Sequence, residues 1–220
     1  MTKPTTSRPM LQRYTASQRI NHWLTALTFI LLAVSGLALF HPSFYWMSHL
    51  LGGGPWTRIL HPFIGVVMFI SFTIFSIRMI PQNLFIRQDF IWMRHVKEVL
   101  NDEGDKIPPV GKYNAGQKVL FWILVLCMIT LLLTGIVMWR SLFSMYFSIG
   151  VIRIATVLHA LAAFGIICSI IVHVYAAFWV KGSIQAMTRG WVTPGWAWKH
   201  HRLWFREWAR KQPHDDVKKY

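Results

Sequence analysis

The sequence predicts an all-α integral membrane protein, a four-helix bundle followed by a cytoplasmic or interfacial, amphipathic C-terminal tail. Of its 220 residues, 54% are hydrophobic and 14% are charged, whereas a soluble domain carries about a quarter of its residues as charges. The apolar residues gather in four long stretches that contain no Asp, Glu, Lys or Arg. These observations argue against a soluble enzyme.

The four stretches comprise residues 23–40, 59–77, 119–139 and 154–180. About 20 apolar residues cross a hydrocarbon core of about 30 Å as a helix. With their flanking turns, the stretches predict membrane helices at about 17–40, 59–80, 115–140 and 154–180. The first one is expected to be retained and not cleaved as a secretion signal, because its apolar run continues to Phe40.

Charge divides the chain into a membrane domain over residues 1–180 and a basic, tryptophan-rich tail over residues 181–220. The whole chain has 23 Lys and Arg against 8 Asp and Glu, and such an excess requires an anionic partner. Long charge-free aromatic blocks are not typical of nucleic-acid binding. The expected partner of the tail is therefore anionic lipid, with no nucleic acid.

Orientation follows from the basic residues of the connecting segments, since cytoplasmic segments retain positive charge. Twenty of the 23 lie before the first stretch, between the second and third, or after the fourth. The two other loops contain only Arg58, Arg140 and Arg153. Both termini and the 81–118 loop are therefore expected in the cytoplasm.

Four histidines are expected at two depths of the bundle. His159 and His173 lie 14 residues apart in the fourth stretch, which places them about 21 Å apart along a helix and within about 40° of one face. His61, near the outer end of the second stretch, falls at the level of His159. His22, beside the cytoplasmic end of the first, falls at the level of His173.

Two depth-matched pairs of imidazoles predict two haem groups, because imidazoles from facing helices bind haem iron from both sides. His61 with His159 forms the outer pair and His22 with His173 the inner pair. The chain has no Cys-Xaa-Xaa-Cys-His, so both haems are expected to be non-covalent haem b. A single membrane histidine is more often a packing or proton-relay residue, but that reading does not account for matched depths. The six remaining histidines are expected to be solvated or interfacial: His41, His49, His95, His200, His201 and His214.

A polar run at residues 111–118 precedes the third stretch on the cytoplasmic side. The side chains of Asn114 and Gln117 can donate hydrogen bonds to the carbonyl oxygens of a quinone. They also have the spacing of a helix N-cap and its third residue. The residues alone favour neither reading.

Three runs resemble the gamma subunit of membrane-bound formate dehydrogenases, a four-helix dihaem cytochrome b: Arg-Ile-Leu-His-Pro-Phe at 58–63, Gly-Lys-Tyr-Asn-Ala-Gly-Gln-Lys at 111–118, and the twelve residues at 173–184. The likeness extends from about Tyr14 to about Arg206. It implies that His22, His61, His159 and His173 are haem ligands, and that Asn114 and Gln117 lie at a quinone site.

The resemblance also implies a bacterial inner-membrane complex of three subunits. Its partners would be an iron–sulfur beta subunit with one membrane helix and a catalytic alpha subunit that contains molybdenum or tungsten. Electrons from formate, oxidised outside, would pass through this chain to menaquinone or ubiquinone on the cytoplasmic side. The chain would not oxidise formate by itself.

Three alternatives remain open at this stage. The cytochrome b subunits of nickel–iron hydrogenases also place histidines at similar depths, which leaves the electron donor undecided. A haem-free membrane anchor or transporter would use the histidines for packing or proton relay. A stand-alone oxidoreductase would act without partners. Thiol chemistry is not expected, because Cys127 and Cys168 both lie in apolar stretches.

Overall fold

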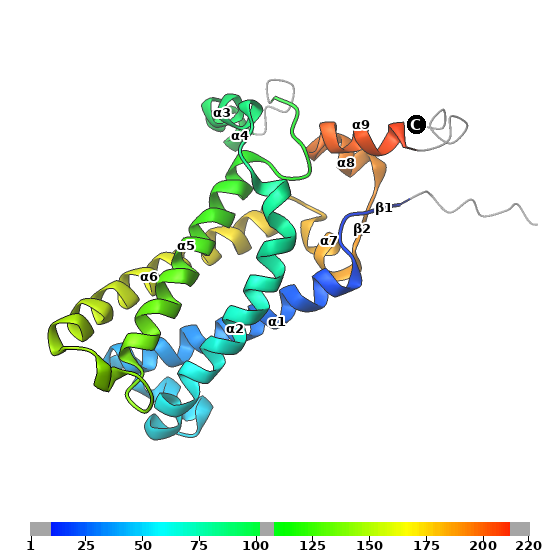
Figure 1. The fold of residues 1–220 in the computed structure, drawn as a ribbon. Helices are drawn as coiled ribbons and strands as arrows, with labels where there is room; N and C mark the ends of the chain where they lie inside the picture. Colours follow the sequence, from blue (N-terminus) through cyan, green and yellow to red (C-terminus); the bar gives the residue numbers. More distant parts are fainter. Residues whose placement is uncertain (1–9, 102–107, 212–220) are drawn as a thin grey trace, which may run out of the picture. The chain divides into compact units, whose positions relative to one another are not determined.

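The computed structural model describes residues 10–101 and 108–211 of the chain, most of them in helices (Figure 1). In chain order the elements are β1 (Leu11–Gln12), α1 (Ala16–Phe40), the 3-10 helix η1 (Pro42–Leu51), α2 (Gly54–Asn83), α3 (Arg87–Arg94), α4 (Val96–Leu100), α5 (Ala115–Met138), the 3-10 helix η3 (Ser144–Tyr146), α6 (Ile149–Trp179), α7 (Ser183–Arg189), β2 (Trp191–Val192), α8 (Pro194–His200) and α9 (Arg202–Arg210).

Four of these helices, α1, α2, α5 and α6, are long and apolar enough to cross a membrane. They have 25, 30, 24 and 31 residues, and at about 1.5 Å per residue each one exceeds the thickness of a hydrocarbon core. The predicted all-α fold with four membrane helices is confirmed, and the chain is a multi-pass membrane protein.

Two of the long helices begin five residues earlier than expected. α2 starts at Gly54 and α6 at Ile149, where the apolar stretches suggest 59 and 154. The charge-free stretches begin directly after Arg58 and Arg153, but the helical backbone hydrogen bonds extend to residues before these two arginines. Pro55 also suits the first turn of α2, because proline lacks the N–H that remains unpaired there.

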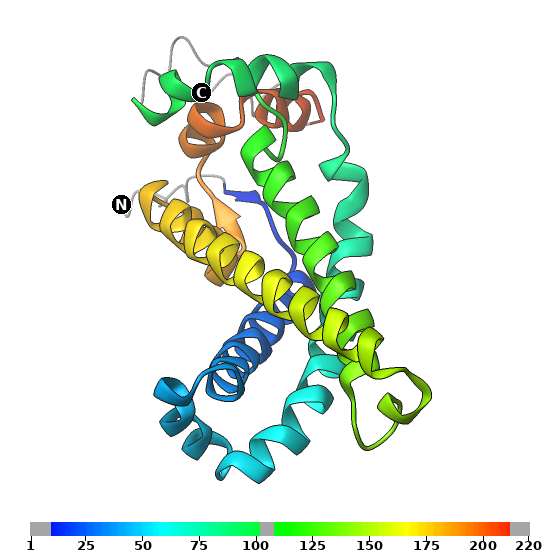
Figure 2. The same ribbon diagram turned by 90° about the vertical axis from the view of Figure 1, so that its left-hand side faces the viewer.

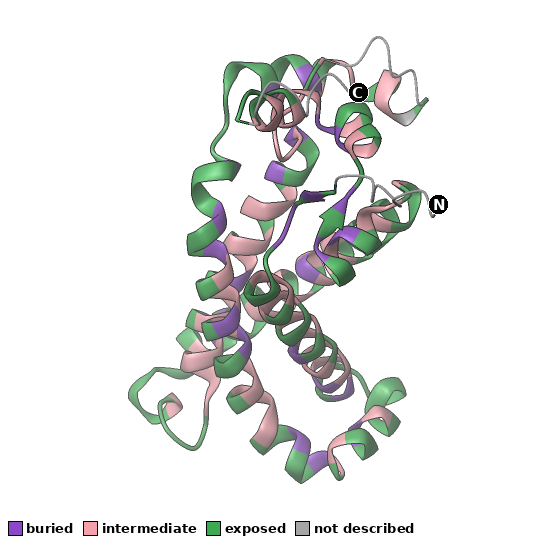
Figure 3. Cartoon of the chain, turned by 90° about the vertical axis from the view of Figure 1, so that its right-hand side faces the viewer, coloured by how far each residue is buried: buried purple, intermediate pink, exposed green. Residues whose placement is uncertain are grey.

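Few side chains of the long helices are buried, and many of the large apolar ones are exposed at the protein surface (Figure 3). In α6 only Ala155 and Ile166 are buried. An apolar surface of this extent is unfavourable in water, whereas in hydrocarbon it carries no such penalty. The exposure pattern is therefore that of helices surrounded by lipid.

The chain divides into two compact units. The membrane unit consists of Ser17–Met79 and Leu120–Ala176, and the loop–tail unit consists of the described parts of Met1–Ala16, Ile80–Val119 and Ala177–Tyr220. The predicted domain boundary between residues 180 and 181 stays a prediction. Residues 212–220 of the predicted tail lie outside the described residues.

The core of the membrane unit is small and lies midway along the helices. Met68 of α2, Met128 of α5 and Ile166 of α6 are buried against one another, and Phe29 and Leu32 of α1 pack beside them. Methionine is well suited to this position because its flexible side chain fills irregular gaps between helices. This layer lies, by sequence position, between the two levels of histidines.

Two hairpins build the membrane unit, α1 with α2 and α5 with α6 (Figure 2). In the first hairpin the hydroxyl of Ser71 donates to the Asn21 side chain over 2.6 Å and lies 2.8 Å from the Thr25 hydroxyl. Polar side chains that bond across helices stabilise membrane bundles by about 0.6 to 2 kcal/mol. This contact links the N-terminal half of α1 to α2.

The loop–tail unit departs from the purely helical prediction. β1 pairs with β2 in a short antiparallel ladder, with Leu11 opposite Val192, so the segment before α1 is bound to the tail. Leu11, Val192 and Ala197 are buried together. The tail itself folds as three short helices, α7, α8 and α9, in place of one amphipathic segment.

Candidate functional site

The predicted outer pair of histidines lies in the N-terminal halves of α2 and α6. The ring centroids of His61 and His159 are 6.4 Å apart, and their planes meet at 60°. Each ring contacts a hydroxyl group through its Nδ1 atom: His61 lies 2.7 Å from Ser35 Oγ and His159 lies 2.8 Å from Thr134 Oγ1. The structure thus brings together the two side chains that the depth argument places at one level.

The inner pair joins α1 to α6. The centroids of His22 and His173 are 6.3 Å apart with an angle of 50° between the planes. The other ring neighbours of His22 are Trp23 at 5.3 Å and Phe75 at 6.1 Å. The Nδ1 atom of His22 is buried and has no hydrogen-bond partner among the described residues.

Both pairs fit a haem iron bound by two imidazoles. A metal–imidazole bond is about 2 Å long, and the ring centroid lies about 1 Å beyond the nitrogen, so two such ligands have centroids about 6 Å apart. The described part of the chain has no group of three or more His, Cys, Asp and Glu side chains that would bind a bare metal ion. A porphyrin supplies four nitrogens of its own, so two protein ligands complete its coordination.

Among the described glycines, Gly36 and Gly135 lie beside the outer rings. A Cβ atom on Gly36 would lie 3.5 Å from Cε1 of His61, and one on Gly135 would lie 3.6 Å from Cε1 of His159. The nearest atoms to Gly65 and Gly165 belong instead to Leu32 and to Cys127. Both distances are ordinary van der Waals contacts, so Gly36 of α1 and Gly135 of α5 lie beside the imidazoles, but the space there does not itself require glycine.

Asn114 and Gln117, in the loop–tail unit, form a capping box at the start of α5. Asn114 Oδ1 accepts from the backbone N–H of Gln117 at 2.9 Å, and Gln117 Oε1 accepts from the backbone N–H of Asn114 at 3.0 Å. The prediction that Asn114 and Gln117 cap the start of this helix is therefore confirmed. It uses only the side-chain oxygens, so the amide NH₂ groups of both residues are not consumed by it.

Comparison with known proteins shows the family of the chain. Residues 13–190 match the family model described as prokaryotic cytochrome b561. The chain belongs to the prokaryotic cytochrome b561 family. Membership of a cytochrome b family implies haem b, which the two imidazole pairs fit.

Several relatives of this cytochrome b561 family member are known by name. It is 48% identical over 91% of its length and 94% of the relative to the formate dehydrogenase cytochrome b556(fdo) subunit of Escherichia coli K12. It is 44% identical to the formate dehydrogenase cytochrome b556 subunit of Haemophilus influenzae, over 93% and 86% of the two chains. Identity to the nitrate-inducible cytochrome b556(Fdn) subunit of E. coli K12 is 39%, over 90% and 91%. The predicted resemblance to formate dehydrogenase gamma subunits is confirmed.

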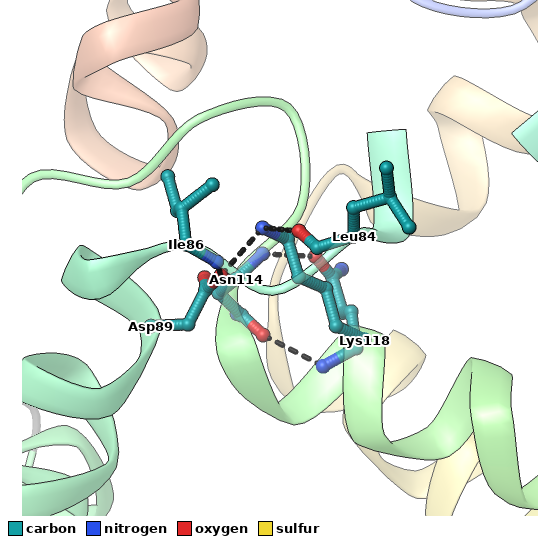
Figure 4. Close-up of polar contacts among 6 residues, drawn as sticks. Leu84, Ile86, Asp89, Asn114 and Lys118 are labelled. Carbon is teal, nitrogen blue, oxygen red and sulfur yellow. Dashed lines mark hydrogen bonds and ion pairs between the residues drawn. The ribbon is translucent and has the colours of Figure 1, made fainter. Parts of the chain in front are cut away.

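A buried ion pair supports the capping box of this family member (Figure 4). Lys118 Nζ lies 2.7 Å from Asp89 Oδ2, with both side chains about 95% buried, and it also donates to the carbonyl oxygen of Leu84 at 3.0 Å. The same Asp89 oxygen accepts from the backbone N–H of Ile86 at 2.7 Å. The pair binds α3 to the first turn of α5, and no sequence signal connects two residues 29 positions apart.

A second cluster that the sequence did not reveal surrounds Arg13. Its guanidinium group donates to the carbonyl oxygen of Lys112 at 2.7 Å and is nearly fully buried. The centroids of four aromatic rings lie 5.0 to 5.7 Å from it, those of Tyr14, Tyr113, Trp196 and Trp204. Cation–π attraction is strongest for such desolvated cations, so Arg13 holds the N-terminal segment against the tail.

His201 in this cluster corrects one expectation. It was predicted to be solvated or interfacial, but only 3% of it is exposed, because it packs between Trp196 and Trp204. Its Nδ1 lies 2.9 Å from the carbonyl oxygen of Gly111, to which only a protonated nitrogen can bond. Burial, and then the neighbouring charge of Arg13, hold the pKa of His201 well below its ordinary value of 6.5.

The other five histidines outside the pairs fall into three groups. His41 and His49 are exposed, and His95 and His200 are half-buried. These four agree with the expectation. His214 lies outside the described residues.

The buried neutral His201 predicts that the free energy of unfolding falls on acidification. Unfolded histidine binds a proton below about pH 6.5, whereas folded His201 stays neutral to lower pH. Stability is therefore complete above pH 6.5 and is lost towards the folded pKa, by up to about 1.4 kcal/mol per pH unit. His201→Asn keeps an N–H donor and removes the titration. We expect the thermal midpoint, followed by tryptophan fluorescence between pH 7.5 and 5, to fall more steeply in wild type than in this variant. Equal slopes would contradict the assignment.

Proposed function

We propose that this chain is the dihaem b-type cytochrome subunit of a formate dehydrogenase. It would carry electrons from an iron–sulfur subunit on the outer side of the membrane to quinone on the cytoplasmic side. The observation that supports this most directly is the meeting of four imidazoles in two pairs, His61 with His159 and His22 with His173. The proposed ligands are these four residues.

The two pairs are separated along the membrane normal because α6 contributes to both. His159 and His173 are 14 residues apart on one continuous helix, a rise of about 21 Å. Haem b bound at a pair supplies a centre that gains and loses one electron. Two such levels in one bundle connect the two faces of a hydrocarbon core of about 30 Å.

The direction across the membrane is inferred from the basic residues. Both termini and the loop before α5 carry most of the Lys and Arg, so we place them in the cytoplasm of a bacterium, with the chain in its inner membrane. The exposed Trp191 and Trp198 lie among the basic residues of the tail. Aromatic and basic side chains together favour contact with anionic lipid headgroups.

The names of the relatives support a formate dehydrogenase as the complex, and the partners are those that the resemblance of the sequence to gamma subunits implies. The relatives are cytochrome b556 subunits of formate dehydrogenases, so we infer a catalytic alpha subunit with molybdenum or tungsten and an iron–sulfur beta subunit with one membrane helix. The chain would then serve the enzyme as its electron-transferring and quinone-reducing subunit, without oxidising formate itself.

Asn114 and Gln117 are the proposed quinone-binding residues. Their oxygens maintain the capping box, while their amide NH₂ groups remain as donors for the carbonyl oxygens of menaquinone or ubiquinone. Capping and quinone binding are therefore compatible uses of the same two side chains. The buried contact of Lys118 with Asp89 keeps this first turn of α5 in place.

Isolation of the chain from bacterial membranes in mild detergent tests the assignment to formate dehydrogenase. We expect an iron–sulfur subunit and a molybdenum- or tungsten-containing subunit to co-purify, and formate to reduce the b-type haem absorption. Hydrogen should leave the spectrum unchanged. Reduction by hydrogen and not by formate would assign the chain to a hydrogenase, and a blank pyridine haemochrome assay would identify a haem-free anchor.

Replacement of an inner ligand tests the pairing. We expect two haems per chain in wild type and one in His22→Gln, because the outer pair does not depend on α1 for an imidazole. The measurement is the pyridine haemochrome content per chain of the purified complex. His49→Gln, at an exposed histidine, is the control and should retain both. Loss of both haems from a folded His22→Gln variant contradicts the scheme.

Carboxylate variants separate the two uses of the capping box. Asn114→Asp and Gln117→Glu keep the oxygens that accept from the backbone, and a negative charge at a helix N-terminus is favourable. They remove the amide donors. We expect unchanged thermal stability with formate-driven quinone reduction about tenfold slower, the loss of about one hydrogen bond. Asn114→Ala should lose both properties. Wild-type quinone reduction in both carboxylate variants excludes these residues as donors to quinone.

A further inference from the structure

The two imidazole pairs differ in what holds their Nδ1 atoms. In the outer pair each ring contacts a hydroxyl group on the preceding helix of its own hairpin, Ser35 on α1 for His61 and Thr134 on α5 for His159. Both hydroxyl residues are buried, with 1% and 7% of their surface exposed. These contacts are therefore shielded from competing solvent.

The same short arrangement occurs in both hairpins. A hydroxyl residue is followed by glycine, as Ser35-Gly36 in α1 and as Thr134-Gly135 in α5. A Cβ atom on the glycine would be in van der Waals contact with Cε1 of the ring, and the hydroxyl lies within hydrogen-bond distance of Nδ1. Two unrelated stretches of sequence thus present an imidazole with the same surroundings, which argues against an incidental packing contact.

The backbone contacts of the two hydroxyl groups are compatible with an imidazole that donates from Nδ1. Ser35 Oγ donates to the carbonyl oxygen of Leu32 at 3.2 Å, and Thr134 Oγ1 donates to that of Thr130 at 2.6 Å. Once its proton is used in this way, a hydroxyl oxygen can only accept from the histidine. If Nε2 of His61 and of His159 binds the haem iron, the ring proton resides on Nδ1, and the hydroxyl oxygens of Ser35 and Thr134 accept from it.

The inner pair has no equivalent acceptor in the described part of the chain. Nδ1 of His22 is buried without a hydrogen-bond partner, and the ring contacts Trp23 and Phe75 beside His173. The outer imidazoles are therefore supported by hydrogen bonds, whereas His22 is held by ring packing.

We propose that Ser35 and Thr134 are positioning residues that make a haem bound by His61 and His159 lower in reduction potential than one bound by His22 and His173. An acceptor at Nδ1 makes the imidazole a stronger electron donor through Nε2 and so favours the oxidised iron. Electrons then reside preferentially at the inner pair. This inference rests on the proposed dihaem function.

Redox titration of the purified complex, followed by optical and electron paramagnetic resonance spectra, tests the inference. Wild type should show two haems with distinct potentials. Ser35→Ala combined with Thr134→Val should retain two haems, raise the lower potential and leave the higher one unchanged. Ser35→Thr and Thr134→Ser keep the hydroxyl and should restore the wild-type values. Retention of both haems with unchanged potentials would overturn the proposal.

A matched control and a second measurement complete the test. Thr130→Val removes a hydroxyl from α5 that bonds only to the Leu126 carbonyl, and it should leave both potentials unchanged. In His22→Gln the remaining haem should show the lower wild-type potential, and the higher one would overturn the proposal even where the hydroxyl variants do not assemble. Fewer than two haems in wild type would instead reject the dihaem function.

Discussion

The structure depends on placing four imidazoles in an apolar bundle. A neutral imidazole has one lone pair and one N–H group, and an unpaired polar group in hydrocarbon is unfavourable by several kcal/mol. In the outer pair the hydroxyl groups of Ser35 and Thr134 pair with Nδ1, and the two ring centroids lie 6.4 Å apart. The pairing of His61 with His159 is thus set by contacts that α1 and α5 supply. The small core of Met68, Met128 and Ile166 separates this level from the inner one.

In the loop–tail unit, the contacts that matter most are those of buried positive charges. Arg13 is surrounded by aromatic rings and bonds to the Lys112 carbonyl, while Lys118 is paired with Asp89. Burial, and then the charge of Arg13, also lower the pKa of Lys112. Since an unpaired buried charge is costly, these contacts account for the ordering of short segments that have little core of their own. They bring the segment before α1, the start of α5 and the tail into one unit.

Membership of the cytochrome b561 family and the geometry of the two imidazole pairs both support the binding of haem b. The family match rests on the whole span of residues 13–190, whereas the pairs rest on four side chains. The relatives add the formate dehydrogenase assignment, which no contact within the chain encodes. The capping box uses the side-chain oxygen of Asn114 and does not involve its amide NH₂ group.

The sequence by itself determined the four membrane helices and the two depths of His22, His61, His159 and His173. Both follow from local properties, the length of apolar runs and the rise of a helix. Only the tertiary structure decided the contacts between distant residues, such as Asp89 with Lys118, the burial of His201 and the hydroxyl partners of the outer histidines. Such contacts depend on how helices rotate and pack against one another, and a hydrophobic pattern read along one helix contains no record of its neighbour's side chains.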